Sequence, residues 1–494
     1  MSFAPVRWAC LLHGIAGTLG AFRAPPATLS REQARADLDQ LQQLLETRFA
    51  YRRLKGVDDR GLLDHARRRV ADGVSTTDFA IEVAQVLAQF GDGHSRVRGV
   101  GSMAAALGHL PCALIDAGGR VAAIKLDGRT CLSSGHPYLV SIDGEPLDRW
   151  LDAAAKFAPR GARQLHRRGS IEWLRYIAVM RRELGLPSAD TATVALESSD
   201  GQRRVELGLR LAHGSDRQPP SPHKRTLEAR VLEGDVGYLR IAEMDGEDRF
   251  LHELRRCVER LRETRGLIID VRGNSGGSRD VLRSLLPYFM RADDAPRIAN
   301  VAAYRLGPEE APDRPDGYLA DRFLYPAAWS GWSEAERRAI SEFAARFKPE
   351  WAPPAGEFSD WHYFVISRAS TGRVARYERP VIVLMDGDSF SATDVFCGAM
   401  KGWRSVTLMG TPSGGGSGRA KEYTLTHSGL RVLLSSMASF QPSGALYDGR
   451  GVEPDAIVEP TLSDLLGESD TLLDSARARL AVPTPADPVS DHDR

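Results

Sequence analysis

The chain has 494 residues, of which 42% are apolar and 26% charged, and its 65 Lys and Arg residues equal its 65 Asp and Glu residues. This length allows two or three domains with sizeable cores, and the composition is ordinary for a globular protein. A formal net charge of zero offers no basic field to gather nucleic acid or an anionic membrane, so we expect no nucleic-acid partner. The composition leaves the oligomeric state open.

Residues 1–24 carry a weak secretory-signal pattern. Arg7 precedes an apolar stretch from Trp8 to Phe22, although His13 and Arg23 weaken the pattern. We expect export to the periplasm or the exterior, with a cytoplasmic location as the alternative. No later apolar run reaches the ~18 residues that a spanning helix needs, so no transmembrane segment is expected.

The cysteines do not indicate a metal site. They show no CxxC or Cys/His ligand spacing, so zinc is not suggested. Cys112 and Cys131 lie beside two expected strands, which leaves open a disulfide in an oxidising compartment or two buried thiols. Cys397 has the spacing of a packed core residue in a helix. The five cysteines are Cys10, Cys112, Cys131, Cys257 and Cys397.

Residues 25–100 are expected to form an N-terminal helical domain. Ser30 is placed to cap a helix from Arg31 to Thr47, with Leu38, Leu41, Leu44 and Leu45 on one face. A second helical pattern, Thr77 to Phe90, leads into the loop Phe90-Gly-Asp-Gly-His-Ser95. That loop presents His94, although a lone loop histidine is more often a surface residue.

Residues 101–215 read as a β-rich module. Short alternating apolar runs predict strands, and a helical pattern at 162–183 interrupts them. A proline-containing linker, His213 to Lys224, separates the module from a core that we place at 225–465. The predicted strands are 112–115, 121–124, 139–142, 193–197 and 204–209.

The core holds two buried strands that each end in a tight turn. Arg265-Gly-Leu-Ile-Ile-Asp-Val-Arg-Gly-Asn-Ser-Gly-Gly-Ser278 ends in glycines, which leave backbone N–H groups bare, as an oxyanion hole requires. Pro380-Val-Ile-Val-Leu-Met-Asp-Gly-Asp-Ser-Phe-Ser-Ala-Thr-Asp394 places Ser391 where a strand meets a helix. That position suits a nucleophile, and the alternative is that Ser389 and Ser391 only cap the helix.

Between these strands lies an expected insertion, residues 291–361, with a capped helix beginning after Ser333. Its aromatic residues either line a peptide groove or stabilise a long insertion, and the second use is more common. After the core, residues 466–494 are expected to form a C-terminal helix and a disordered tail. The insertion tryptophans are Trp329, Trp332, Trp351 and Trp361.

Taken in order, these segments resemble peptidase family S41 over roughly residues 30 to 460. Asp388-Ser-Phe-Ser-Ala-Thr-Asp394 is similar to the family's Gly-Ser/Thr-Ala-Ser-Ala-Ser-Glu pattern, and Phe390 departs from it outright. Leu267-Ile-Ile-Asp-Val-Arg-Gly-Asn-Ser-Gly-Gly277 looks like the family's most specific signature. The resemblance implies an α/β (α+β multidomain) fold with a crotonase/ClpP-like ββα core. The piece Gly135 to Pro146 resembles a PDZ segment, which makes 101–215 a PDZ-like module.

Two catalytic arrangements are known in this family. In one branch a lysine follows a Gly-Glu-Pro-Thr turn, but the matching stretch here, Gly410 to Ser417, has Gly416 at that place. Lys421 is a poor substitute, because a five-residue slip on a strand changes the face to which it points. The resemblance therefore implies the Ser-His-acid branch.

In that branch His94 matches the base, and Asp448, 57 residues after Ser391, stands where the acid is usually Glu. Glu453 is the alternative acid, and the bland interpretation of Asp448 is a turn aspartate before glycine. The implied oxyanion donors are the amides of Gly276 and Ala392, with Gly277 as the alternative to Gly276. The resemblance implies a serine-type peptidase that acts on peptide or protein substrates and needs no metal or cofactor. The rivals are a non-proteolytic ligand- or peptide-binding protein on the same fold and an esterase.

Overall fold

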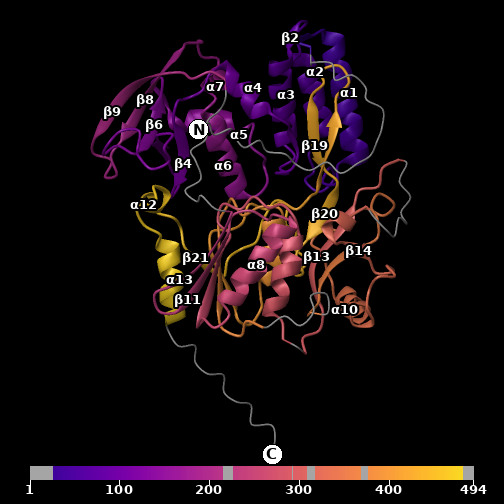
Figure 1. Cartoon of the computed structure of the whole chain (residues 1–494). Helices are drawn as coiled ribbons and strands as arrows, with labels where there is room; N and C mark the ends of the chain where they lie inside the picture. The colour runs from indigo at the N-terminus through magenta and orange to yellow at the C-terminus, as the bar shows by residue number, and fades with distance from the viewer. Residues whose placement is uncertain (1–25, 215–225, 292, 309–317, 369–375, 482–494) are drawn as a thin grey trace, which may run out of the picture.

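The computed structural model describes residues 26–214, 226–291, 293–308, 318–368 and 376–481. The expected signal segment, most of the expected linker and the expected disordered tail lie outside the described residues. The chain folds as a mixture of helices and sheets, with an indigo helical region and a purple sheet above a larger sheet core (Figure 1).

The N-terminal region is helical because apolar residues repeat with the helical period and polar residues cap the ends. Ser30 and Gln33 form a capping box at the start of the first long helix, which confirms the predicted cap, and Leu38, Leu41 and Leu45 are fully buried. The short strands β1 and β2 pair antiparallel. The elements are β1 (Thr28–Leu29), α1 (Arg31–Arg48), α2 (Asp59–Arg69), β2 (Val74–Ser75), α3 (Thr76–Ala88), β3 (Arg96–Val97) and α4 (Val100–Leu107).

The next region contains the predicted strands and the predicted helical interruption. Its antiparallel sheet has the order β4-β5-β6-β8-β9, with β7 paired to β6. Trp150 is buried and donates to the Ile142 carbonyl at 3.0 Å, which ties α5 to β6. The elements are β4 (Ala113–Ala117), β5 (Arg120–Ile124), β6 (Tyr138–Ile142), β7 (Glu145–Pro146), α5 (Leu147–Ala155), α6 (Arg163–Leu174), α7 (Ile177–Leu184), β8 (Thr191–Glu197) and β9 (Arg204–Arg210).

The core sheet has the order β10-β11-β12-β16-β17-β21 and is parallel except for β10. Its central strands are continuous apolar runs because both faces are covered. Ile269 and Val383 face α8, α9 and α11, whereas Ile268 and Ile382 face α13. The elements are β10 (Leu227–Leu232), β11 (Val236–Ile241), α8 (Asp248–Arg260), β12 (Gly266–Asp270), α9 (Asp280–Leu285), η1 (Leu286–Phe289), β16 (Val381–Met385), α11 (Ala392–Met400), β17 (Val406–Gly410), β21 (Ala456–Ile457), α12 (Leu462–Leu465) and α13 (Thr471–Ala481).

The expected insertion contributes to a second sheet, of order β14-β15-β13-β20. A capping box of Ser333 and Glu336 begins α10, as predicted. A third sheet, β18-β19-β3, joins the C-terminal half of the chain to the N-terminal region, and Figure 1 shows the orange β19 beside the indigo helices. The elements are β13 (Arg297–Tyr304), η2 (Ala320–Arg322), β14 (Tyr325–Pro326), α10 (Glu334–Ala344), β15 (His362–Ile366), β18 (Ala420–Thr424), β19 (Arg431–Ser435) and β20 (Met437–Phe440).

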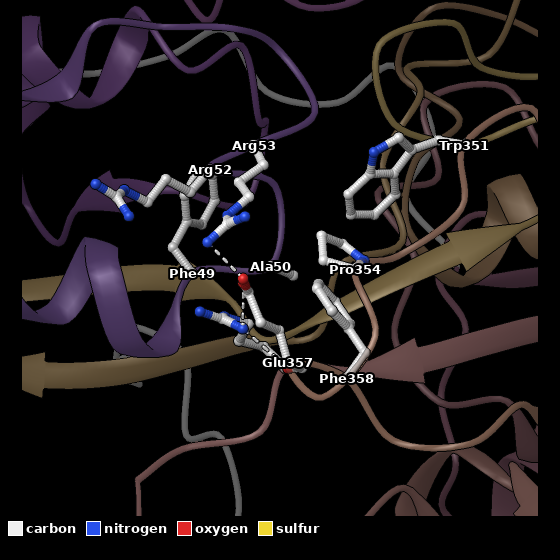
Figure 2. A pocket seen from close by; sticks show the side chains of 9 residues that line it. Phe49, Ala50, Arg52, Arg53, Trp351, Pro354, Glu357 and Phe358 are labelled. Atoms are coloured by element: carbon white, nitrogen blue, oxygen red, sulfur yellow. Dashed lines mark hydrogen bonds and ion pairs between the residues drawn. The ribbon is translucent and has the colours of Figure 1, made fainter.

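The tryptophans of the insertion pack mainly against one another and against neighbouring aromatic rings. Trp329 stacks on Tyr325 at 3.8 Å between ring centroids and meets Trp332 edge-on at 4.9 Å. Trp351 lines a small hollow between this region and the chain after α1, where Glu357 pairs with both Arg53 and Arg305 (Figure 2). This hollow includes none of the predicted site residues.

Candidate active site

Ser391 occupies a sharp turn between β16 and α11. Its backbone has φ 61° and ψ −114°, a left-handed conformation that is rare for a residue with a side chain and costs free energy. Its N–H donates to Asp394 Oδ2 at 2.7 Å, and its side chain is partly exposed. The turn therefore presents the Ser391 hydroxyl at the edge of the core sheet, where a ligand can reach it.

His94 lies against this hydroxyl although 297 residues separate the two in sequence. The distance from His94 Nε2 to Ser391 Oγ is 3.2 Å, within hydrogen-bonding reach. Phe390 stacks on the imidazole with ring centroids 4.6 Å apart and planes at 28°. The residue that departs most from the family pattern thus forms one wall of the histidine pocket.

Gly416 forms another wall of that pocket. A Cβ atom at this position would lie 3.2 Å from His94 Nδ1 and 2.5 Å from the Phe390 ring. The Phe390 ring, and to a lesser extent the imidazole, therefore take the space that a side chain at position 416 would need. Lys421, the substitute considered for a lysine base, instead places its ammonium over the Tyr318 ring, 4.0 Å from the centroid.

Burial keeps the imidazole of His94 neutral. The pKa of His94 is lowered to about 4, chiefly by removal from water and also by the charges of Arg96 and Arg322, while the charge of Asp92 acts in the opposite direction. A neutral imidazole can accept a proton from a hydroxyl, which a protonated one cannot. His94 Nδ1 is buried and has no hydrogen-bond partner among the described residues.

The glycine-rich turn after β12 lies beside Ser391. Gly276 has φ +100°, and a Cβ atom there would lie 2.7 Å from Ser391 Cβ and 2.8 Å from the Ala392 nitrogen, so only glycine fits. The Gly276 N–H donates to Asn274 Oδ1 at 2.9 Å. The N–H groups of Gly277 and Ala392, by contrast, donate to no acceptor in the described parts of the chain.

Ion pairs made by Asp270 hold this turn on the sheet. Asp270 is fully buried and accepts hydrogen bonds from Tyr238 and Arg272, and Arg240 lies 3.1 Å from its Oδ2. Arg272 also bridges to Asp470 just before α13. These contacts fix the position of the turn relative to β11, β12 and α13.

The two candidate acids occupy different surroundings. The Asp448 side chain is completely buried, with Oδ1 3.6 Å from Lys55 Nζ, and burial together with the charge of Asp92 raises its pKa well above the usual value. Asp448 has no hydrogen bond to the His94 ring among the described residues. Glu453 is exposed, and its backbone carbonyl accepts a hydrogen bond from Lys401 Nζ.

Asp394 is a site residue that the sequence reasoning did not single out. Its buried carboxylate accepts the N–H groups of Ser391, Gly415 and Gly416 and the hydroxyl of Ser413. It thereby ties the Ser391 turn to the glycine loop that touches His94. The acidic residue three positions after the serine, in the place of the family's Glu, is the signal that could have identified it.

The described residues contain no metal-binding cluster, no membrane-spanning helix and no disulfide. Within those parts of the chain, no group of three or more His, Cys, Asp or Glu residues is arranged to hold a metal ion. No described helix is long and apolar enough to cross a membrane. Cys112 and Cys131 are both free thiols, so the disulfide considered for them is not formed, and Cys397 is fully buried as expected.

Comparison with known proteins links this site to one family. The profile of peptidase family S41 matches residues 235–458, which include Ser391 and the glycine turn. A carboxy-terminal-processing protease of Bartonella bacilliformis is 32% identical over 102 residues, 21% of this chain. That match spans 23% of the relative's length.

Solved structures extend the similarity of fold to most of the chain. Mature CPAF superposes with a TM-score of 0.62 at 20% identity, covering 88% of this chain and 94% of that one. Mature CPAF in complex with lactacystin gives 0.63 at 18% identity, covering 91% and 98%. The region that contains the Ser391 turn and the glycine turn, residues 235–458, thus matches peptidase family S41, and the fold of most of the chain is similar to that of mature CPAF.

Proposed function

We propose that this protein is a serine-type peptidase that cleaves peptide bonds in peptide or protein substrates through an acyl-enzyme. One observation carries the proposal: the 3.2 Å approach of His94 Nε2 to Ser391 Oγ in a chain whose residues 235–458 match a peptidase family. The proposal includes a crotonase/ClpP-like core, for which the largely parallel sheet is the support, and a PDZ-like module formed by β4 to β9.

In the proposed reaction, His94 accepts the proton of Ser391 as Oγ attacks the scissile carbonyl carbon. The carbonyl oxygen becomes an oxyanion, which backbone N–H groups stabilise. Ala392 supplies one of these groups. Gly277 is better placed than Gly276 to supply the other, because the Gly276 N–H is already bonded to Asn274.

The tetrahedral intermediate then collapses. His94 gives its proton to the leaving amine, the C–N bond breaks, and Ser391 stays acylated. Water, deprotonated by His94, attacks the ester, and the proton returns to Ser391 Oγ as the acid product leaves. A carboxylate near the imidazole stabilises its protonated form during both steps. Asp448 is the residue expected in that role, and its buried side chain lies 3.6 Å from Lys55 Nζ.

A fluorophosphonate probe tests the proposal directly, because it reacts with an activated serine hydroxyl irrespective of the natural substrate. We expect rapid labelling, mapped by mass spectrometry to the peptide that contains Ser391, and none in Ser391→Ala. His94→Ala should slow labelling by about a thousandfold. Lys421→Ala is the matched control and should label normally, since its ammonium is engaged with Tyr318.

Two results would remove the proposal. Labelling that persists at full rate in Ser391→Ala would exclude Ser391 as the nucleophile. Loss of labelling in Lys421→Ala with normal labelling in His94→Ala would show that lysine is the base. A comparison of the rates of peptide hydrolysis and of simple ester hydrolysis then distinguishes a peptidase from an esterase. If the wild-type protein is not labelled at all, a ligand-binding role is favoured.

A further inference from the structure

The two turns that carry the proposed oxyanion donors follow neighbouring strands of the core sheet. The pairing of β12 with β16 ends with the hydrogen bond from the Val271 N–H to the Leu384 carbonyl, at 2.9 Å. Beyond it, Gly277 lies on one turn and Ala392 on the other, and the N–H groups of both donate to no acceptor among the described residues. The distance between these two donors therefore depends on the contacts that join the turns to each other.

Asp386 makes one of these contacts with its side chain. Its Oδ1 accepts the N–H of Gly273 in the glycine turn at 3.0 Å. The same oxygen accepts the N–H groups of Asp388 and Ser389 in the Ser391 turn, both at 3.0 Å. Oδ2 also lies 3.0 Å from the Gly273 nitrogen. A single oxygen atom of Asp386 thus holds backbone groups of both turns.

Ser389 makes a second contact between the turns. Its buried hydroxyl donates to the Val271 carbonyl at 3.0 Å and accepts the Asp386 N–H at 3.1 Å. The hydroxyl therefore joins two turns, which differs from the helix cap considered from the sequence. A third contact, from the Phe390 N–H to the Asn274 carbonyl at 3.0 Å, involves backbone atoms alone.

We infer that Asp386 is a positioning residue that sets the spacing of the two oxyanion donors, with Ser389 as its partner. The inference rests on the proposed function, because it assigns what holds the oxyanion hole together. Such a hole works only when both N–H groups lie within about 3 Å of the same oxygen. Asp386 and Ser389 act through the turns that carry Gly277 and Ala392, and not on the substrate.

The contacts of Asp386 need an acceptor oxygen rather than a negative charge. Asp386→Ala removes that oxygen and with it the side-chain contact to Gly273. Asp386→Asn keeps an oxygen that can take the place of Oδ1, so it can retain the contacts to both turns. Ser389→Ala removes the contact to Val271. Because the backbone contact between the turns remains in all three variants, we expect the turns to loosen and not to separate.

The test is the phosphorus NMR spectrum of the protein labelled with a fluorophosphonate. Ser391 Oγ attacks phosphorus, fluoride leaves and His94 takes the hydroxyl proton, so the adduct places a phosphonyl oxygen where the oxyanion would lie. The chemical shift reports the hydrogen bonds to that oxygen, so the folded wild-type adduct should differ from the same adduct unfolded in urea. In Asp386→Ala we expect about half of that difference to be lost.

The labelling rate supplies a second readout. In Asp386→Ala the rate at saturating probe should fall by about tenfold, while the probe concentration that gives half of that rate stays the same, because the spacing matters at the attack and not for probe binding. Asp386→Asn should lose about threefold and keep most of the shift difference. Ser389→Ala should also lose part of the shift difference, because its contact between the turns is gone.

Asp388→Asn is the matched control in the same turn. Its side chain is half-exposed and pairs with Arg168, and only its backbone N–H meets Asp386. The Asp388→Asn adduct should therefore give the wild-type chemical shift.

A wild-type shift in Asp386→Ala would overturn the inference, whatever the labelling rate of that variant. Equal losses in Asp386→Ala and Asp388→Asn would also overturn it. Circular dichroism shows whether each variant is folded. If Asp386→Ala is not, a reduced shift difference in Ser389→Ala supports the inference and an unchanged one overturns it. A wild-type protein that forms no adduct at Ser391 overturns the proposed function, and the inference with it.

Discussion

Asp394 shows how one buried carboxylate can organise the turn that carries Ser391. Each of its oxygens accepts two hydrogen bonds, Oδ2 from Ser391 and Gly416 and Oδ1 from Gly415 and Ser413. Burial raises the pKa of Asp394 to about 7, although these donors lower it. Its ionised form is the one that can accept four bonds, so protonation removes part of what holds Ser391 and the glycine loop together.

These two pKa values predict the pH dependence of labelling at Ser391. The pKa of His94 is lowered to about 4, so the base stays neutral down to that pH and is lost below it. Asp394 becomes ionised as the pH rises through about 7. We therefore expect the wild-type rate to increase in two steps, near pH 4 and near pH 7. In Asp394→Asn the upper step should vanish and the plateau should fall, because an amide nitrogen would face two donors.

Asp388→Asn is the control for this experiment, because Asp388 lies in the same turn but is half-exposed and pairs with Arg168. The Asp388→Asn variant should keep both steps of the pH profile.

The contribution of Asp394 to the stability of the fold should change with pH in the opposite direction to the labelling rate. The folded-state pKa of Asp394 lies above the unfolded value, so its contribution is largest at low pH and is lost as the pH rises through about 7. A single step near pH 6 to 7 that is unchanged in Asp394→Asn would contradict this account.

The glycine turn after β12, the Ser391 turn after β16 and the glycine loop 413–416 after β17 meet at one edge of the core sheet. They do so because these strands are neighbours and parallel, so all three end on the same side. The glycine loop 413–416 lies against the imidazole. The Phe390 ring and the His94 imidazole leave no room for a side chain at position 416. A side chain at position 416, where the other branch has its lysine, would thus compete with these two rings for one volume.

Gly416→Ala tests this competition. Gly416 does not have a left-handed backbone, so alanine adds only a methyl group, which would lie 2.5 Å from the Phe390 ring and 3.2 Å from His94 Nδ1. We expect the ring to move from Ser391 and labelling to slow by at least about tenfold. The matched control is Gly208→Ala on β9, where a methyl group meets no atom within 4 Å. Equal labelling rates in the two variants would show that the loop shifts enough to accommodate the methyl group without moving His94 from Ser391.

The sequence allowed prediction of the elements whose residues carry a local signal. The apolar runs of β12 and β16, the cap at Ser30 and the cap at Ser333 are of this kind, and all are confirmed. The contact of Lys55 with Asp448 has no local signal, because it depends on how a loop after α1 meets a turn 393 residues later. The stacking of Phe390 on His94 was hidden for the same reason.

The site combines distant parts of the chain, because His94 and Ser391 are 297 residues apart in sequence. β3, two residues after His94, pairs with β19 through Val97 and Val432. Gln40 of α1 also accepts hydrogen bonds from Thr426 in the turn between β18 and β19. Figure 1 shows this hairpin lying among the N-terminal helices. The docking of the hairpin therefore helps to hold the His94 loop against the core.

Asp37 anchors that docking through two buried hydrogen bonds. Its buried carboxylate accepts the backbone N–H groups of His427 at 2.9 Å and Ser428 at 2.7 Å. Asp37→Ala leaves both groups without an acceptor, and we expect the free energy of unfolding in urea to fall by about 2–4 kcal/mol. Labelling at Ser391 should also slow, because the loop that carries His94 is held less firmly.

Asp39→Ala provides the matched control on the same helix. Asp39 is exposed and makes a surface ion pair with Arg67 at 2.6 Å, so its loss should cost less than about 1 kcal/mol and leave labelling unchanged. If Asp37→Ala is no more destabilised than Asp39→Ala, the hairpin is held by its apolar contacts, with Leu425, Leu430 and Val432 in the N-terminal core. If Asp37→Ala is destabilised but labels at the wild-type rate under native conditions, the His94 loop keeps its place through β3 alone.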